Sequence, residues 1–229
     1  ERKVMQRIGF PWSPSLVART LASAGGTLEA ARTALDVGFA GVLAGGTHHA
    51  YRAEGSGFCV FNDLAIAAAD LLARGAAQRV LIVDLDVHQG DGTASIFADE
   101  PRVFTFSMHG ERNFPLRKQV SDLDVPLPDG TGDAQFLELL DEHLSAAYER
   151  SRPQFVLYQG GVDPLAQDKL GRLALTHAGL AERDERVFRF AREHGLPLVA
   201  TLGGGYADPI DPTIEAHLNT YRAARAVFG

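Results

Sequence analysis

The sequence predicts an α/β fold in which helices cover both faces of a mainly parallel central sheet, a three-layer αβα arrangement. Five short apolar runs indicate strands, at residues 42–44, 80–83, 103–106, 155–158 and 198–202. Their continuous apolar character predicts burial on both faces, which is typical of parallel strands. Segments with helical periodicity lie between the runs, and strands that alternate with helices favour a parallel sheet.

Capping and turn residues mark the ends of the predicted helices. Thr27 is expected to cap a helix that ends at Gly38, and residues 64–73 form the next helical segment. Asp133 is expected to cap a helix with one apolar face. That face consists of Phe136, Leu140, Leu144 and Ala147.

The two C-terminal helices are predicted in the same way. One runs from about Ala178 and ends before Gly195, with Pro197 just beyond it. The other is predicted from a single apolar stripe. The stripe consists of Ile214, Leu218, Tyr221, Ala224 and Phe228.

Two parts of the chain lack such a pattern. Residues 113–132 form the longest irregular stretch, and a long loop is more often functional than accidental. Residues 1–26 contain no clear strand, so we expect an N-terminal part of the domain to be missing. Because no linker, repeat or low-complexity tract interrupts the chain, residues 1–229 are expected to form a single domain.

Composition excludes several classes of protein. The net charge of −7 leaves no global basic field for binding phosphates, so direct nucleic-acid binding is not expected. The single cysteine, Cys59, excludes a disulfide scaffold, and a lone cysteine between Phe58 and Val60 is expected in the core. No apolar run approaches the roughly 18 residues of a membrane span. Without an export signal or disulfides, a cytoplasmic location is expected, and an oligomer is possible.

Polar side chains with catalytic chemistry follow all five predicted strands. In open α/β sheets, ligands bind at the carboxyl ends of the strands, so these side chains are expected to converge. In strand order they are His48 and His49; Asp84, Asp86 and His88; Ser107 and His109; Asp163; and Tyr206.

The Asp84, Asp86 and His88 side chains predict a metal site. Because side chains alternate along a strand, these three share one face. Two carboxylates and an imidazole held together there would be unfavourable without a cation, because the carboxylates repel each other and all three groups lose water. Asp163, after Gly160 and Gly161, is the natural third ligand, which leaves one coordination position open for water. Acids facing water, and a turn aspartate before a proline, remain the alternatives. Because position 161 is glycine rather than a second acid, one catalytic metal is expected.

A metal with two carboxylate ligands acidifies its water weakly, so a general base is expected nearby. His48 and His49 are suited to that task, with Asp84 and Asp91 as partners for their second nitrogens. Tyr206, after three glycines, could donate a hydrogen bond to a developing oxyanion. Together these groups predict metal-assisted hydrolysis of a carbonyl substrate. One buried and one exposed histidine, and a tyrosine that only fills a loop, remain the alternatives.

Four motifs in this order resemble those of the histone deacetylase superfamily. They are Gly45-Gly46-Thr47-His48-His49-Ala50, Gly57-Phe58-Cys59-Val60-Phe61-Asn62-Asp63, Asp84-Leu85-Asp86-Val87-His88-Gln89-Gly90-Asp91-Gly92 and Gly203-Gly204-Gly205-Tyr206. The match spans roughly residues 40–210. Residues 168–173, Thr176 and Arg183-Asp184 resemble the class IV branch and its bacterial relatives. Gln89 departs from the many members that have a second histidine there.

The resemblance implies a zinc-dependent deacetylase or deacylase that cleaves an acylated lysine peptide or another acylated amine, with an arginase/deacetylase-like fold. Asp86, His88 and Asp163 would bind one Zn²⁺ per chain. The resemblance further implies a proton-transfer pair of His48 and His49, backed by Asp84 and Asp91, and a carbonyl-polarising Tyr206. Its implied substrate-binding residues are Gly57, Phe58, Phe114 and Gly204. A structural monovalent cation such as K⁺ would lie at Asp84, Ser107 and Met108.

Two other readings remain open. One is a binuclear manganese ureohydrolase of the arginase type, against which the glycine at position 161 counts. The other is a non-catalytic protein that binds acylated amines.

Overall fold

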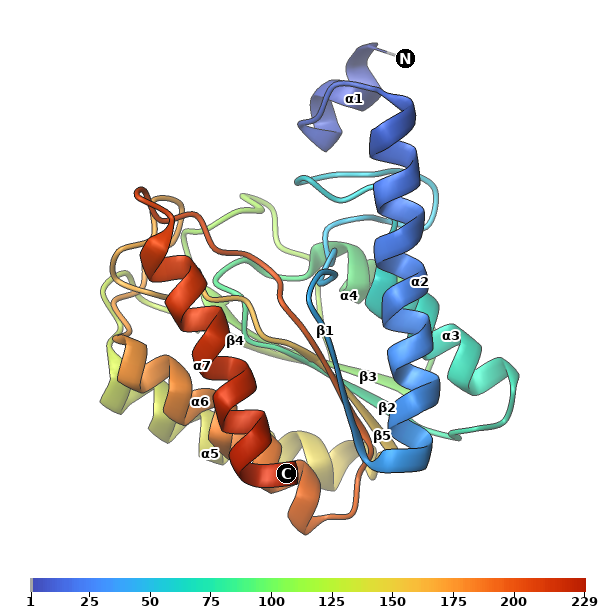
Figure 1. Ribbon diagram of the computed structural model, residues 1–229, viewed down its shortest axis with the longest axis vertical. Helices are drawn as coiled ribbons and strands as arrows, with labels where there is room; N and C mark the ends of the chain where they lie inside the picture. Colours follow the sequence, from blue (N-terminus) through green and yellow to red (C-terminus); the bar gives the residue numbers. More distant parts are fainter. Residues whose placement is uncertain (1) are drawn as a thin grey trace.

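A six-stranded parallel sheet runs through residues 2–229, the part of the protein that the computed structural model describes (Figure 1). Its strands are β1 (Phe39–Val42), β2 (Val80–Asp84), β3 (Val103–Gly110), β4 (Leu123–Leu127), β5 (Phe155–Gln159) and β6 (Leu198–Thr201). The helices of the same residues are α1 (Arg2–Ile8), α2 (Pro14–Val37), α3 (Asp63–Ala73), α4 (Asp91–Phe97), α5 (Asp133–Ser151), α6 (His177–Glu193) and α7 (Asp211–Phe228).

The strand order is β1-β6-β5-β2-β3-β4, and the paired strands are parallel. From β2 the chain moves outward to β3 and β4, then returns to form β5 on the other side of β2. The direction of winding therefore reverses between β2 and β5. Crevices for ligands form at the carboxyl ends of the strands at such a reversal.

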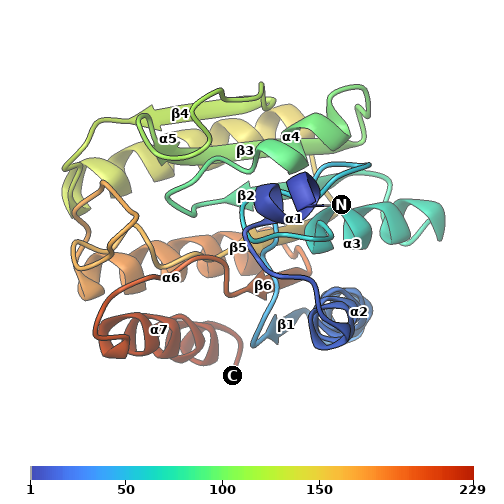
Figure 2. The ribbon, with the colours of Figure 1, turned by 90° about the horizontal axis from the view of Figure 1, so that it is seen from above.

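Helices cover both faces of the sheet, which confirms the predicted three-layer αβα fold (Figure 2). Helices α5, α6 and α7 bury one face together with Leu81 and Val83 of β2. Helices α2 and α3 bury the other face together with Val80 and Ile82. Because alternate residues of β2 enter opposite cores, residues 80–83 must all be apolar, as they are.

Strand β4 lies inside the stretch that was expected to be irregular, so that expectation was wrong. It is an edge strand that pairs with β3 alone, and only its alternate residues Val125 and Leu127 are buried. Pro126 interrupts its apolar pattern, and an edge strand tolerates the missing N–H. Strand β1 ends at Val42, where the sequence pattern had predicted a start.

Helix α2 begins much earlier than predicted. Ser13 caps it by accepting a hydrogen bond from Leu16 N (3.0 Å), and Pro14 occupies the first turn. Thr27 therefore lies inside the helix, and its expected role as a cap was wrong. Its hydroxyl instead donates to Asp63 Oδ2 (2.6 Å). The predicted end at Gly38 is confirmed, because Gly38 adopts the left-handed conformation with φ 87°.

Helix α5 has the buried face that was predicted, but Asp133 does not cap it. Gly132 occupies the N-cap, and the Asp133 carboxylate accepts hydrogen bonds from Thr176 N (2.8 Å) and Thr176 Oγ1 (2.6 Å). Phe136, Leu140, Leu144 and Ala147 are buried as expected. The Asp133 carboxylate therefore bonds to the start of α6 instead of capping α5, so the predicted cap was wrong.

Helix α7 buries only part of the predicted stripe, because Ala224 is buried and Phe228 packs against the core but Ile214 and Leu218 do not. Ile214 and Leu218 are 49% and 48% exposed. The buried residues of α7 are mainly small: Thr213, Ala216, Thr220, Ala223, Ala224 and Val227. Small side chains let α7 pack closely on its neighbour α6, so the longer aliphatic side chains lie at the flank. None of the helices in residues 2–229 is long and apolar enough to cross a membrane.

Candidate metal centre and active site

The loops after β2 and β5 bring Asp86, His88 and Asp163 together, as the sequence predicted. His88 Nδ1 lies 3.0 Å from Asp86 Oδ1 and 3.0 Å from Asp163 Oδ2. All three side chains are buried, and their potential ligand atoms lie within 4.8 Å of one another. Strand β2 ends at Asp84, yet Leu85 and Val87 still point into the core, so the alternation continues through the loop.

This donor set fits a divalent cation. Asp163 Oδ2 is buried, and apart from the 3.0 Å contact with His88 Nδ1 it has no hydrogen-bond partner among the residues that the structure describes. Burial and the neighbouring charge of Asp86 raise the pKa of Asp163. Two desolvated carboxylates around one imidazole are costly unless a cation neutralises them. Oxygen and nitrogen donors of this kind suit Zn²⁺ and other first-row divalent ions.

Glycines allow the surrounding loops to approach the three residues closely. A Cβ at Gly161 would collide with Asp86 Oδ2, and a Cβ at Gly204 would collide with Asp163 Oδ2. Gly204 N also donates to Asp86 Oδ2 (2.8 Å). The sequence had assigned Gly204 to substrate binding, whereas its N–H contacts a candidate metal ligand.

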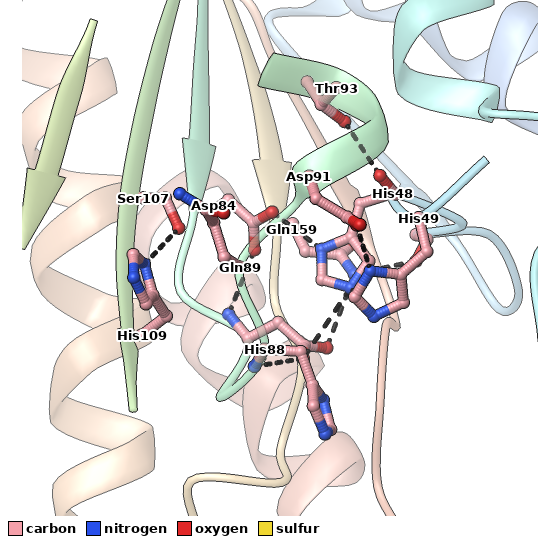
Figure 3. Close-up of polar contacts among 12 residues, drawn as sticks. His48, His49, Asp84, His88, Gln89, Asp91, Thr93, Ser107, His109 and Gln159 are labelled. Atoms are coloured by element: carbon pink, nitrogen blue, oxygen red, sulfur yellow. Dashed lines mark hydrogen bonds and ion pairs between the residues drawn. The ribbon is translucent and has the colours of Figure 1, made fainter. Parts of the chain in front are cut away.

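His48 and His49 lie side by side, each with its own carboxylate (Figure 3). His48 Nδ1 lies 2.7 Å from Asp84 Oδ2, and His49 Nδ1 lies 2.6 Å from Asp91 Oδ1. The two Nε2 atoms are 3.1 Å apart. Both expected histidine–aspartate pairs are therefore present as contacts.

The two histidines differ in electrostatics. Burial opposes protonation of His48, but the charges of Asp84 and Asp86 outweigh it and raise its pKa to about 9. Burial and the adjacent His48 lower the pKa of His49 to about 4. Without bound metal, these shifts favour a cationic His48 and a neutral His49 near neutral pH. Neighbouring groups with separated pKa values are typical of acid–base machinery.

Asn62 and Asp63, at the start of α3, hold the loop that carries the histidines. Asp63 accepts hydrogen bonds from Gly46 N (3.0 Å), Thr47 N (2.7 Å) and Thr47 Oγ1 (2.7 Å). Asn62 Nδ2 donates to His48 O (3.2 Å), while Asn62 Oδ1 caps α3. Neither residue was predicted to have a role. An asparagine directly before an apolar helical run is the signal that could have identified the cap.

Tyr206 follows the glycine loop after β6 and faces the same centre. Its ring centroid lies 6.4 Å from that of His88 and 6.3 Å from that of Phe58. Tyr206 N donates to Asp168 Oδ2 (2.5 Å), which anchors the loop. Burial and the charges of Asp86 and Asp163 raise the pKa of Tyr206, so its hydroxyl stays protonated and can donate.

Two cavities reach these residues. One, of about 730 Å³, is lined by three of the residues that the resemblance assigned to substrate binding. Its walls include Gly57, Phe58, Phe114, His49, His88 and Tyr206. The other, of about 740 Å³, extends between α2 and the loops after β1 and β6. The Phe114 ring packs edge-on against His49, with centroids 4.8 Å apart.

The amino-acid sequence is similar to that of a known protein family. A family model described as the histone deacetylase domain matches residues 3–221. The chain belongs to the histone deacetylase family. Its residues are 51% identical, over 99% of the chain, to an uncharacterized protein of Picosynechococcus sp.. They are 36% identical to histone deacetylase 2 of Arabidopsis thaliana over 89% of the chain. A probable deacetylase of Archaeoglobus fulgidus is 35% identical over 82% of the chain.

The relatives differ in how much of their own length the chain covers. It spans 75% of the Picosynechococcus protein. It spans 51% of the Arabidopsis histone deacetylase and 56% of the Archaeoglobus protein.

The residues that the family resemblance assigned to a monovalent cation lie next to each other. Asp84 of β2 pairs in register with Ser107 of β3, and Met108 follows. Ser107 Oγ lies 2.9 Å from His109 Nδ1, and Asp84 Oδ1 accepts a hydrogen bond from Asp86 N (3.2 Å). The K⁺ assignment stays a prediction.

Gln89 replaces the second histidine of many family members and has a structural role. It is buried, and its Nε2 donates to Gln119 O and to Asp124 Oδ1, both at 2.8 Å. Its Oε1 accepts from Gln119 N (2.8 Å). Gln89 therefore attaches the candidate metal loop to β4 and to the segment before it.

Proposed function

We propose that this protein is a metal-dependent deacylase that hydrolyses the amide of an acylated lysine or a similar amine. The proposal rests on one observation, the convergence of Asp86, His88 and Asp163 opposite the pairs His48–Asp84 and His49–Asp91. Family membership supports the reaction class, and the printed names of the Arabidopsis and Archaeoglobus relatives support deacetylation.

We propose Zn²⁺ as the metal, held by Asp86, His88 and Asp163. When bound there, it would polarise the substrate carbonyl and lower the pKa of a water molecule. Two carboxylates and one imidazole leave a coordination position open, which is typical of catalytic rather than structural zinc.

His49 is the proposed general base. It is neutral near pH 7, its Nδ1–H donates to Asp91, and its Nε2 therefore carries the lone pair that can accept a proton. The carboxylates of Asp84 and Asp86 favour protonation of His48, so we assign His48 to stabilise negative charge rather than to take a proton. Tyr206 is proposed to donate its hydroxyl hydrogen to the carbonyl oxygen as that oxygen becomes negative.

The two cavities suggest where the parts of the substrate lie. We propose that the lysine side chain enters between Phe58 and Phe114, which are 46% and 42% exposed. The second cavity has apolar walls that include Phe10, Leu16 and Leu202. This lining supports acceptance of acyl chains longer than acetyl.

The binuclear ureohydrolase alternative is disfavoured by Gly161. A second metal would need a further bridging carboxylate at this point, and a Cβ there would collide with Asp86. A non-catalytic binding protein would not need the His49–Asp91 pair, so we favour an enzyme.

Hydrolysis assays test the proposal. Metal-reconstituted protein is given matched acetyl-lysine and long-chain acyl-lysine peptides, with a chelator-treated control. We expect chelator-sensitive release of an acyl group, and the ratio of the two rates reports the depth of the acyl pocket. Tyr206→Phe is expected to retain the metal and lose most turnover. Absence of release from both peptides, with metal bound, would contradict the proposal and favour a binding role.

His49→Ala tests the assignment of the base. The variant is expected to retain its metal and to lose roughly 10²–10⁴-fold in kcat, the usual contribution of a positioned general base. Metal content measured by elemental analysis provides the control. Turnover close to that of the wild type would show that the base lies elsewhere.

A further inference from the structure

Helix α6 places a charged pair under the candidate metal centre. Arg183 and Asp184 are buried, with exposed fractions of 0% and 1%. Burying an ion pair is expensive, and replacing such a pair by apolar residues is often neutral or stabilising. The pair occupies helix positions between the buried Leu180 and Val187, where periodicity calls for apolar side chains. Stability alone therefore does not account for its presence.

The Arg183 guanidinium joins the two loops that carry the candidate ligands. Its Nη1 donates to Leu85 O (3.1 Å) and to Gly161 O (2.6 Å). Leu85 directly precedes Asp86, and Gly161 lies two residues before Asp163. One rigid, planar group thus bonds to the backbone beside each of the two carboxylate ligands.

A second layer of contacts fixes Arg183 itself. Asp184 Oδ1 accepts from Arg183 Nε (2.9 Å) and from the Tyr158 hydroxyl (2.5 Å). Asp184 Oδ2 accepts from Thr220 Oγ1 (2.6 Å). Tyr158 belongs to β5 and Thr220 to α7, and both are buried. Asp184, which bonds to the guanidinium, is therefore itself held by β5 and α7, independently of the loops that Arg183 contacts.

We infer that Arg183, supported by Asp184, is a positioning residue that sets the spacing of the Asp86 and Asp163 carboxylates around the metal. This inference rests on the metal centre of the proposed function. The two carboxylates repel each other, and the cation below them, bonded to both loops, opposes their separation. Groups outside the ligand set that orient the ligands typically contribute 10–100-fold to metal affinity.

Cobalt binding to Arg183→Met tests the inference. Metal-stripped full-length protein is titrated with Co²⁺, and affinity and visible absorption bands are recorded well below each variant's melting temperature. We expect roughly 10–100-fold weaker binding and altered bands, which report coordination geometry. Arg186→Met is the matched control, because Arg186 lies on the same helix but pairs with Glu182 and Asp141 at the surface. Its affinity and bands should match the wild type.

Thr220→Val provides a milder variant that keeps Arg183. It removes one hydrogen bond to Asp184, and we expect a several-fold weaker Co²⁺ affinity with a smaller change of the bands. If Arg183→Met does not fold, this variant decides the question. Wild-type affinity and bands in Arg183→Met, or in Thr220→Val where it decides, overturn the positioning role. Wild-type protein that binds no Co²⁺ would instead overturn the metal centre itself.

Discussion

The Asp91 carboxylate shows how single residues shape the proposed base. Its Oδ1 contacts His49 Nδ1, and its Oδ2 accepts a hydrogen bond from the Tyr51 hydroxyl (2.8 Å). Burial favours the neutral acid, but the bonds from His49 and Tyr51 outweigh it and hold the pKa of Asp91 below its ordinary value. Tyr51 therefore weakens the basicity of the carboxylate that faces His49.

Removing that hydroxyl should move the pH dependence of turnover. In Tyr51→Phe the Asp91 carboxylate becomes more basic and stabilises protonated His49, so the pKa of His49 rises. The base is then protonated at higher pH, and the acid limb of kcat/KM should shift upward by up to about one pH unit. Tyr148→Phe is the control, because Tyr148 of α5 packs against Phe190. An unchanged acid limb in Tyr51→Phe would show that Tyr51 does not tune the base.

The ionisable residues of the site could be predicted from the sequence, but fewer of the hydrogen bonds that hold them in place could be. His48, His49, Asp84 and Asp91 were predictable because each follows a strand or lies in the same loop. The hydrogen bonds of Asp63 to Gly46 and Thr47 join segments 16 residues or more apart. Such pairings depend on how β1 and α3 pack, so no local pattern reveals them.

Among the helices and strands, the buried residues were predicted correctly where an element has one clear apolar face. They were predicted wrongly where packing against a neighbouring element selects which residues are buried. Helix α5 has a wide apolar face and was predicted correctly. Helix α7 contains both small and large apolar residues, and mainly the small ones are buried because α7 packs closely on α6. Edge strand β4 has only one neighbouring strand and buries only alternate residues, so its sequence lacks the continuous apolar run of the central strands.

A matched pair of leucine substitutions tests this reading of the helices. Leu140→Ala in α5 removes a fully buried side chain and should lower the free energy of unfolding by about 2–5 kcal/mol. Leu218→Ala in α7 removes a half-exposed side chain and should cost less than about 1 kcal/mol. Urea unfolding measures both. Equal losses would show that α7 buries Leu218 after all.

His217 on α7 should make stability depend on pH. Burial and the positive charge of Arg183 lower its pKa to about 4. Below its ordinary pKa near 6.5, the unfolded chain protonates this histidine while the folded protein does not, so stability falls as pH falls from about 6.5 to 4. The loss is at most about 3 kcal/mol.

Urea unfolding of metal-free His217→Gln at several pH values measures this contribution. The variant should show a shallower loss of stability with falling pH than the wild type. His194→Gln, which changes an exposed histidine at the end of α6, should keep the wild-type slope. The same slope in all three proteins would assign the pH dependence to other groups.

For the whole molecule, the proposed metal links the loops of β2 and β5 at the centre of the sheet. Bound metal at 1,000 times its Kd would add about 4 kcal/mol to the free energy of unfolding. Asp163→Ala removes one ligand, so we expect it to abolish metal retention and the metal-induced rise in Tm.

Thermal unfolding with and without Zn²⁺ measures that rise. Asp141→Ala, a surface acid that pairs with Arg186, should keep the full increase. Full metal occupancy in Asp163→Ala would refute the ligand assignment. That residues 1–229 act as a single catalytic domain stays a prediction.

The α/β class, the parallel sheet and the three candidate ligands could all be predicted from the amino-acid sequence. Apolar runs and the residues after them are local features, and the carboxyl ends of parallel strands necessarily meet at one edge. The folded structure was needed to find the opposite pKa shifts of His48 and His49, the buried face of α7 and the position of Arg183 beneath both loops. Each of these depends on distances between segments remote in the chain, because burial and charge act through space rather than along the sequence.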